Sequence, residues 1–353
     1  MREPKVCINV SPLGRRRAGI GRYVYEIVKR LPPLLKDEGV RLELVYSTST
    51  EPDLPPGAFS LRPFDQPEGT PGFYRAVSRY VRGEHALYCN MSNGIPLAHG
   101  VVCIHDIRPL VRRDDSFPAR AKSWMAALDA KRQASAVVTV SQFSKDELVR
   151  HVGIEPERIA VIGNGWEHMN AVAPDAGIFD KLGISGAQRS NFYYTLCSRA
   201  PHKNLDWIQG VAQHNPDATF VVAGMKWSDG DRDESGLDNV IYAGYITDEE
   251  SRALMGGCRA FLYPSVYDGF GIPPLEAAAC GAPLIVSNAS CLPEIYDGFA
   301  AFVDPYDVQV DLHGLTRPRG SVDYTGLLKK YSWDASARFW AGLLARQTKL
   351  LAG

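Results

Sequence analysis

Two carboxylates eight residues apart, Asp268 and Glu276, flank a glycine-rich turn that could bind an anion. The stretch from Ser265 to Gly281 predicts a loop leading into a short helix, because Pro273 and Pro274 suit a first helical turn. A helix N-terminus preceded by glycines offers backbone N–H groups to an anion, most often a phosphate. Glu276 is expected in the first turn, where its charge also suits the helix dipole. A tight core loop with a dipole-capping carboxylate would explain this spacing equally well.

Two cations form a second group that could do chemistry. Arg199 and Lys203 stand four residues apart, directly after the predicted strand from Phe192 to Cys197. An arginine can bind two phosphate oxygens and a lysine adds a point charge, so the pair suits a diphosphate. Taken alone, a solvated basic turn is the default interpretation.

A histidine ends the predicted buried strand from Val101 to Asp106. Polar residues at the carboxyl end of a parallel strand lie where open α/β sheets bind ligands. His105 is therefore a candidate, although a lone histidine is more often structural.

The glycine-rich loop from Gly14 to Gly21 lies between a predicted strand, Lys5 to Val10, and a predicted helix, Arg22 to Leu31. We expect Pro32-Pro33 to end that helix. A strand, a glycine-rich loop and a helix form a common phosphate-approach unit. Val24 occupies the place of the third glycine of the dinucleotide fingerprint, which counts against a dehydrogenase.

The composition is that of a globular protein long enough for two α/β lobes, with 353 residues, 45% hydrophobic and 22% charged. Seven cysteines without a C-x-x-C pair or a Cys/His cluster indicate reduced thiols rather than disulfides or zinc. We expect no signal peptide and no membrane-spanning segment. Residues 1–165 carry 24 Lys and Arg against 18 Asp and Glu, so the first half is basic. Chance asymmetry on a solvated face would give the same imbalance.

The segment from Tyr267 to Asp304, with Pro293-Glu294 and Val303-Asp304-Pro305, resembles the donor-site signature of glycosyltransferase family 4. Members are retaining, nucleotide-sugar-dependent enzymes of the two-lobed GT-B fold. Their motif is Glu-x7-Glu, and Asp268 stands in its first position here, which keeps the charge but shortens the reach. The resemblance covers most of the chain.

The resemblance implies an α/β architecture of two Rossmann-like lobes, with parallel sheets facing each other across a cleft that holds the active site. The acceptor-binding lobe would comprise residues 1–167 and a C-terminal helix, 333–353, that crosses back to it. The donor-binding lobe would comprise residues 168–332.

Several donor-site roles also follow from the resemblance. The donor diphosphate is expected against Arg199 and Lys203 and against the helix N-terminus at Gly271, Ile272 and Leu275. These groups would stabilise the charge that grows on the leaving diphosphate.

The remaining assignments concern the nucleoside, the sugar and the acceptor. Glu276 is expected to accept hydrogen bonds from the ribose, and Asp268 from the donor sugar. Tyr245 and Ile246 begin the loop that lies against the nucleotide base in the family, and His105 is placed on the acceptor side of the active site.

The glycine-rich loop closes over donor and acceptor in the family. Gly19 and Gly21 are the matching residues, and Gly21 is the better match.

The implied reaction moves a hexose, mannose or a related sugar, from a nucleoside diphosphate sugar to a hydroxyl, with retention and without a metal. The stretch from Gly271 to Glu276, with Leu292-Pro293-Glu294, most resembles bacterial mannosyl- or rhamnosyltransferases of surface-polysaccharide assembly. GDP-mannose is the first expectation for the donor and a UDP-sugar the second, with no further cofactor. The alternatives are a nucleotide-sugar epimerase, a phosphorylase, for which no pyridoxal-phosphate lysine motif is seen, or a non-catalytic nucleotide-sugar-binding subunit.

The expected partners follow from the same resemblance and from the basic first half. The acceptor would be a growing glycan, either free or linked to polyprenyl diphosphate. Arginine clusters at Arg15–Arg17, Arg75/Arg79/Arg82 and Arg108/Arg112/Arg113 would allow peripheral contact with an anionic membrane surface. We therefore expect a cytoplasmic protein that is able to contact the inner face of the cytoplasmic membrane, and no nucleic-acid partner. The acidic loop at Asp229 lacks an EF-hand pattern and predicts a solvated segment.

Overall fold

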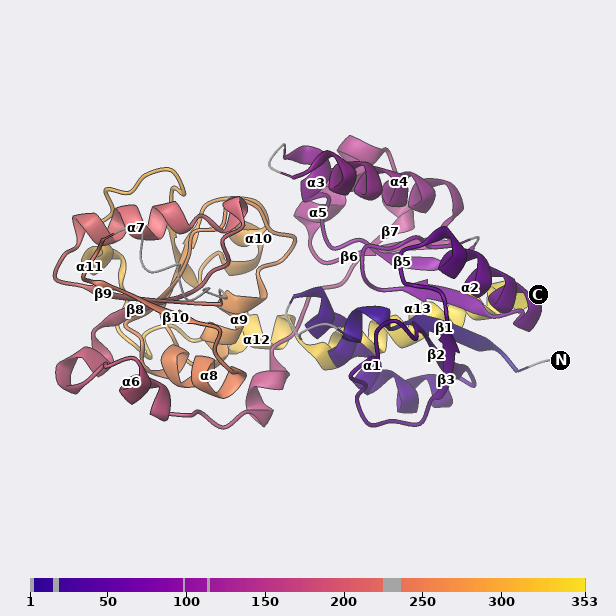
Figure 1. The fold of residues 1–353 in the computed structure, drawn as a ribbon, viewed down its shortest axis with the longest axis horizontal. Helices are drawn as coiled ribbons and strands as arrows, with labels where there is room; N and C mark the ends of the chain where they lie inside the picture. The colour runs from indigo at the N-terminus through magenta and orange to yellow at the C-terminus, as the bar shows by residue number, and fades with distance from the viewer. Residues whose placement is uncertain (1–2, 15–18, 98, 113–114, 225–235, 353) are drawn as a thin grey trace. The chain divides into compact units, whose positions relative to one another are not determined.

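Buried apolar runs alternate with helical stretches along the chain, and this alternation builds two parallel sheets. The computed structural model describes residues 3–14, 19–97, 99–112, 115–224 and 236–352. The chain divides into two units, Met1–Asn164 with Trp333–Gly353, and Gly165–Ser332 (Figure 1). The expected boundary after residue 167 lies a few residues later than this division.

The sheet of the first unit has the strand order β3-β2-β1-β4-β5-β6-β7 in the described residues, and every pairing is parallel. The strands are β1 (Lys5–Asn9), β2 (Arg41–Ser47), β3 (Ser60–Phe64), β4 (Leu87–Asn90), β5 (Val101–Cys103), β6 (Ala136–Thr139) and β7 (Ile159–Val161). Most of these strands are buried along their length, as expected for a parallel sheet covered on both faces.

Helices lie on both faces of this sheet (Figure 1). They are α1 (Ile20–Asp37), α2 (Pro71–Glu84), α3 (Arg108–Val111), α4 (Phe117–Gln133), α5 (Gln142–Glu147) and α13 (Trp333–Ala352), with short 3-10 or π turns at Ser11–Gly14, Leu148–Val152 and Pro156–Arg158. The prediction that Pro32 and Pro33 end α1 is wrong, because the helix continues through both prolines to Asp37. Two interior prolines cost helix stability. We attribute their tolerance to packing, since Leu31, Pro32 and Leu35 are buried.

The terminal helix α13 packs against α1 within the first unit. Its Trp340 indole N–H donates a hydrogen bond of 2.7 Å to the Tyr23 hydroxyl, and both side chains are fully buried. The ring of Trp333 contacts that of Tyr23 edge-on, and Arg30 pairs with Asp334 at 2.5 Å. Helix α13 therefore belongs to the unit that begins the chain, and its buried face is part of that unit's core.

The second unit has a parallel sheet in the order β10-β9-β8-β11-β12-β13 among the described residues. The strands are β8 (Phe192–Leu196), β9 (Thr219–Ala223), β10 (Val240–Gly244), β11 (Ala260–Tyr263), β12 (Leu284–Ser287) and β13 (Ala300–Val303). The helices are α6 (Gly177–Lys181), α7 (Leu205–His214), α8 (Asp248–Gly257), α9 (Ile272–Ala279), α10 (Leu292–Tyr296), α11 (Leu312–Leu315) and α12 (Thr325–Lys330), with 3-10 turns at Glu167–Ala171, Gly186–Ser190 and Pro201–Lys203. Helix α7 covers one face of the sheet and α6 and α8 the other (Figure 1).

Candidate functional site

The carboxyl ends of β8 and β11 bring the best-defined cluster of the second unit together. These strands are neighbours in the sheet, so the segments that follow them meet at one edge. Asn204 fixes the turn after β8, since its side-chain amide donates to the carbonyls of Pro264, at 3.2 Å, and Pro305, at 2.7 Å. Lys203 therefore points at residues that follow β11.

Lys203 is held by two partners. Its Nζ donates to the Tyr263 hydroxyl at 2.8 Å and to Asp268 Oδ1 at 2.6 Å. The backbone N–H of Asp268 in turn donates to Ser290 Oγ at 3.2 Å. The structure thus brings together two predicted residues, a cation and a carboxylate far apart in the sequence.

Asp268 is ionised in this setting. Burial raises the pKa of its carboxyl, but the charge and hydrogen bond of Lys203 outweigh burial, and the net pKa is below its usual value. Its Oδ2 is buried and has no hydrogen-bond partner among the described residues. One oxygen of the carboxylate is therefore bound to Lys203, and the other can still accept a hydrogen bond.

Glu276 has a partner that sequence reasoning missed. Its Oε1 lies 2.7 Å from Nε2 of His168, a side chain that is only 3% exposed. His168 belongs to the turn Glu167–Ala171, far from Glu276 in sequence, and no motif pointed to it. The expectation that Glu276 lies in the first helical turn is wrong, because α9 begins at Ile272 and no acidic residue falls in its first turn. Glu276 is thus positioned by His168 more than by the helix dipole.

The start of α9 supplies fewer N–H groups than its glycine-rich sequence suggests. Gly271 has φ 81°, and a Cβ there would lie 2.8 Å from a Leu292 side-chain carbon, so the turn requires glycine. Pro273 and Pro274 carry no N–H, which leaves those of Gly271 and Ile272 before the first intrahelical bond. Leu275 is fully buried and can contribute only through its backbone.

The other predicted donor-site residues lie in the segments that follow β8 and β10. Arg199 is exposed in the turn after β8. Tyr245 and Ile246 follow β10, and Tyr245 is 56% exposed while Ile246 is buried. Much of the Tyr245 surface is therefore accessible to solvent, and the buried Ile246 anchors the loop.

Gly19 and Gly21 lie at the start of α1, in the first unit. Gly19 is the N-cap, with φ 52°, and Gly21 is already within the helix. The predicted loop from Gly14 to Gly21 includes residues 15–18, which lie outside the described residues, as do Arg113 and the acidic loop at Asp229.

His105 is a buried, neutral side chain at the end of the β5 segment. Its Nε2 lies 2.9 Å from the Met91 carbonyl, which can only accept, so Nε2 carries the proton. The ring also contacts Tyr23 edge-on at 4.7 Å. Burial lowers the pKa of His105 to about 4, and the hydrogen bond to Met91 acts in the opposite direction but does not outweigh burial. The ring is thus held by packing and one hydrogen bond, Nδ1 is left as an acceptor, and the place of His105 on the acceptor side stays a prediction.

Two further observations concern metals and membranes. Among the described residues, no group of three or more His, Cys, Asp or Glu side chains could hold a metal ion. No helix in the part of the chain that the structure describes is both long and apolar enough to cross a membrane.

Comparison with known families gives two matches, one after the other along the chain. Residues 17–168 match the model of Glycosyltransferase Family 4, and residues 186–311 match that of Glycosyl transferases group 1. Together these matches cover most of both units.

Relatives in sequence and in structure agree with these matches. The O-antigen chain mannosyltransferase B of Escherichia coli is 26% identical over 86% of this chain and 87% of its own length. The serotype-specific mannosyltransferase WbdA of Escherichia coli is 28% identical over 68% of this chain, which spans about a third (32%) of that longer protein. Sucrose-phosphate synthase from Thermosynechococcus elongatus has a similar structure, with TM-score 0.73 and 17% identity over 99% of this chain and 100% of its own. The chain belongs to glycosyltransferase family 4 and has the GT-B fold.

Proposed function

We propose that this protein is a retaining glycosyltransferase that moves a hexose, mannose or a related sugar, from a nucleoside diphosphate sugar to a hydroxyl of a growing glycan. The observation that carries this proposal is the cluster of Lys203, Tyr263 and Asp268 at the carboxyl ends of β8 and β11. A fixed cation at this edge of a parallel sheet suits the diphosphate of such a donor.

The reaction depends most on the groups that surround the leaving diphosphate. The bond from the anomeric carbon to the phosphate oxygen breaks, and one from the same carbon to the acceptor oxygen forms on the same face. The acceptor proton passes to the leaving phosphate, so no protein base is needed. Arg199, Lys203 and the N–H groups of Gly271 and Ile272 would stabilise the charge that grows on the leaving group.

The carboxylates would orient the rest of the donor. Glu276, held by His168, would accept from the ribose hydroxyls. Asp268 would accept from a sugar hydroxyl, and Tyr245 would lie against the base. On the acceptor side, His105 would act through its Nδ1 or by packing.

The names of the relatives guide the choice of substrates. Both relatives described above are mannosyltransferases, and one acts on an O-antigen chain. This supports GDP-mannose as the first donor to test and a UDP-sugar as the second. It also supports a glycan acceptor, which we propose is lipid-linked, handled in the cytoplasm at the inner face of the membrane through the basic first unit.

Thermal-shift screening of GDP-mannose and UDP-sugars, followed by transfer of labelled sugar to an extracted glycan, tests the proposal. We expect one nucleotide sugar to raise the melting temperature and the label to appear in a product with retained configuration. Stabilisation without any product would support the non-catalytic subunit instead. Conversion of the nucleotide sugar into its epimer, with no acceptor present, would support the epimerase.

A further inference from the structure

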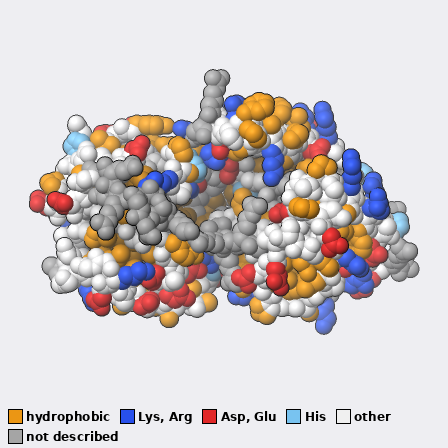
Figure 2. All heavy atoms as spheres, viewed as in Figure 1, with side chains coloured by type: hydrophobic (Ala, Val, Ile, Leu, Met, Phe, Trp, Pro, Cys, Tyr) orange, Lys and Arg blue, Asp and Glu red, His pale blue; other side chains and the backbone are white. Residues whose placement is uncertain are grey.

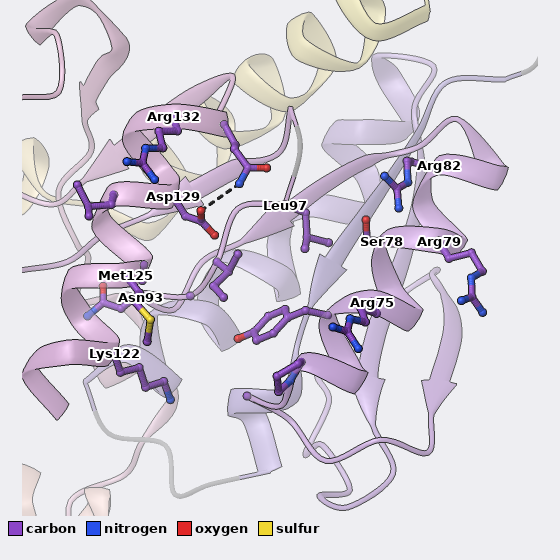
Figure 3. A pocket seen from close by; sticks show the side chains of 18 residues that line it. Arg75, Ser78, Arg79, Arg82, Asn93, Leu97, Lys122, Met125, Asp129 and Arg132 are labelled. Atoms are coloured by element: carbon purple, nitrogen blue, oxygen red, sulfur yellow. Dashed lines mark hydrogen bonds between the residues drawn. The ribbon is translucent and has the colours of Figure 1, made fainter. Parts of the chain in front are cut away.

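A cavity within the first unit lies between helices α2 and α4, with a volume of about 1010 Å³. Arg75, Ser78, Arg79 and Arg82 line the α2 side, and Lys122, Met125, Asp129 and Arg132 line the α4 side, with Leu97 between them (Figure 3). Asn93 also lines the cavity. The helices and loops that line it belong to one unit, so its shape does not depend on the second unit. None of the residues assigned to the transfer reaction lines it.

The cavity carries a strong excess of positive charge. The basic residues that line it are Arg75, Arg79, Arg82, Lys122 and Arg132. The only acidic side chain of the lining is Asp129, whose Oδ1 accepts a hydrogen bond of 3.0 Å from Gln133. None of the five cations has an ion-pair partner among the described residues. Five like charges around one cavity repel each other, and an anion placed between them would remove that repulsion.

Apolar side chains make up much of the remaining lining. They are Pro71, Tyr74, Ile95, Leu97, Met125, Ala126 and Leu128. Met125 is 61% exposed, and two large apolar neighbours on the same helix, Phe117 and Trp124, are exposed as well. Figure 2 shows hydrophobic side chains gathered over α3 and α4, with Lys and Arg towards α2. So much apolar surface beside unpaired cations is unusual on a protein that binds only small anions.

We propose that this cavity binds an amphiphile, with an anionic phosphate or diphosphate head between the arginines and the first part of a hydrocarbon chain against Tyr74, Leu97 and Met125. This inference rests on the proposed function, because the ligand would be the lipid carrier of the glycan acceptor. It adds a specific site and a chain-binding component to the diffuse electrostatic contact expected from the sequence.

Isothermal titration of the full chain with farnesyl diphosphate, below its micelle-forming concentration, tests the site. We expect farnesyl diphosphate to bind at least about tenfold more tightly than inorganic diphosphate or farnesol, a difference of about 1.4 kcal/mol. The double variant Arg75→Gln/Arg79→Gln and the variant Met125→Asp should each weaken binding by at least about tenfold. A matched control, Arg41→Gln/Arg150→Gln, removes two exposed arginines outside the cavity and should keep it.

The other outcomes overturn either the inference or the proposed function on which it rests. Equal affinity for inorganic diphosphate would show a plain anion site, and equal affinity for farnesol a plain apolar one. Unchanged binding in the cavity variants would place the amphiphile elsewhere. Sugar transfer without farnesyl diphosphate binding would overturn the inference and leave the proposed function standing. Absence of both donor binding and transfer would instead remove the proposed function.

Discussion

The ion pair between Lys203 and Asp268 should stabilise the second unit as well as serve the donor. Their side chains are mostly buried, with 21% and 15% of their surface exposed, and the atoms lie 2.6 Å apart. Lys203→Met keeps an apolar chain and removes the charge, so it leaves Asp268 buried without its cation. Breaking a buried pair from one side costs about 3–5 kcal/mol, and the residual exposure favours the lower end, about 3 kcal/mol.

Urea unfolding at pH 7 measures this cost, with Lys181→Met as a control. Lys181 pairs with Glu250 at 2.9 Å but is 55% exposed, so its loss should cost less than about 1 kcal/mol. Adding Asp268→Asn to Lys203→Met should recover at least about half of the loss, because the buried charge is then gone.

As pH falls, the stability of the wild type and that of Lys203→Met should change in opposite directions. In the wild type the pKa of Asp268 is lowered relative to that in the unfolded chain, which is about 3.9. The stabilisation from the ionised carboxylate is therefore complete above about pH 3.9 and is lost as pH falls through the folded pKa. In Lys203→Met burial acts without the ammonium and raises the pKa of Asp268. The variant should therefore gain stability as pH falls from 7 towards 4. A loss below about 1 kcal/mol at pH 7, with no recovery in the double variant, would refute this account of the pair.

Four further expectations follow from the site. Arg199→Ala should lower turnover by about 10² to 10³, measured by release of labelled sugar, if it stabilises the leaving diphosphate. Glu276→Ala should weaken donor binding about tenfold to a hundredfold by titration, and Glu276→Gln, which can still accept from His168, should unfold less readily than the alanine variant. Because His105 has a pKa of about 4, the unfolded chain takes up the proton first, and the wild type should lose about 3 kcal/mol of unfolding free energy as pH falls from 6.5 to 4. The variant His105→Gln should flatten that part of the curve of stability against pH. Treatment with EDTA should leave turnover unchanged, and activity lost to EDTA but restored by Mg²⁺ or Mn²⁺ would contradict a metal-independent reaction.

Much of the fold could be predicted because buried strands leave a strong local signal. The predicted strands at Lys5–Val10 and Phe192–Cys197 are both confirmed, and each ends one residue earlier than expected. The short strand Leu87–Asn90 was missed, since four residues contain no recognisable period. The helix α1 was predicted too short because the local cost of two prolines was weighed without the packing of α13, which lies three hundred residues away in the chain.

The sequence allowed several residues of the candidate site to be predicted, but not which of them contact each other. Sequence order placed Lys203 beside Arg199, whereas the structure pairs it with Asp268 and Tyr263, which only the adjacency of β8 and β11 brings near. His168 could not be predicted, because nothing in its neighbourhood indicates that a buried histidine will meet Glu276. The residue types within each short stretch therefore indicated the class of ligand, and the order of the strands in the sheet decided which side chains pair.

The departure from the family motif at position 268 can now be explained by these contacts. Lys203 has a long side chain that reaches Asp268 across the gap between two strand ends, and its Nζ is also fixed by Tyr263. A glutamate would extend the carboxyl by one carbon–carbon bond, about 1.5 Å, towards the space that the ammonium occupies. Asp268 keeps the negative charge and one unbonded oxygen while Ser290 holds its backbone. The shorter side chain is thus matched to Lys203. We infer that Asp268 places its carboxylate differently from the glutamate of the family motif and keeps the same role towards the donor.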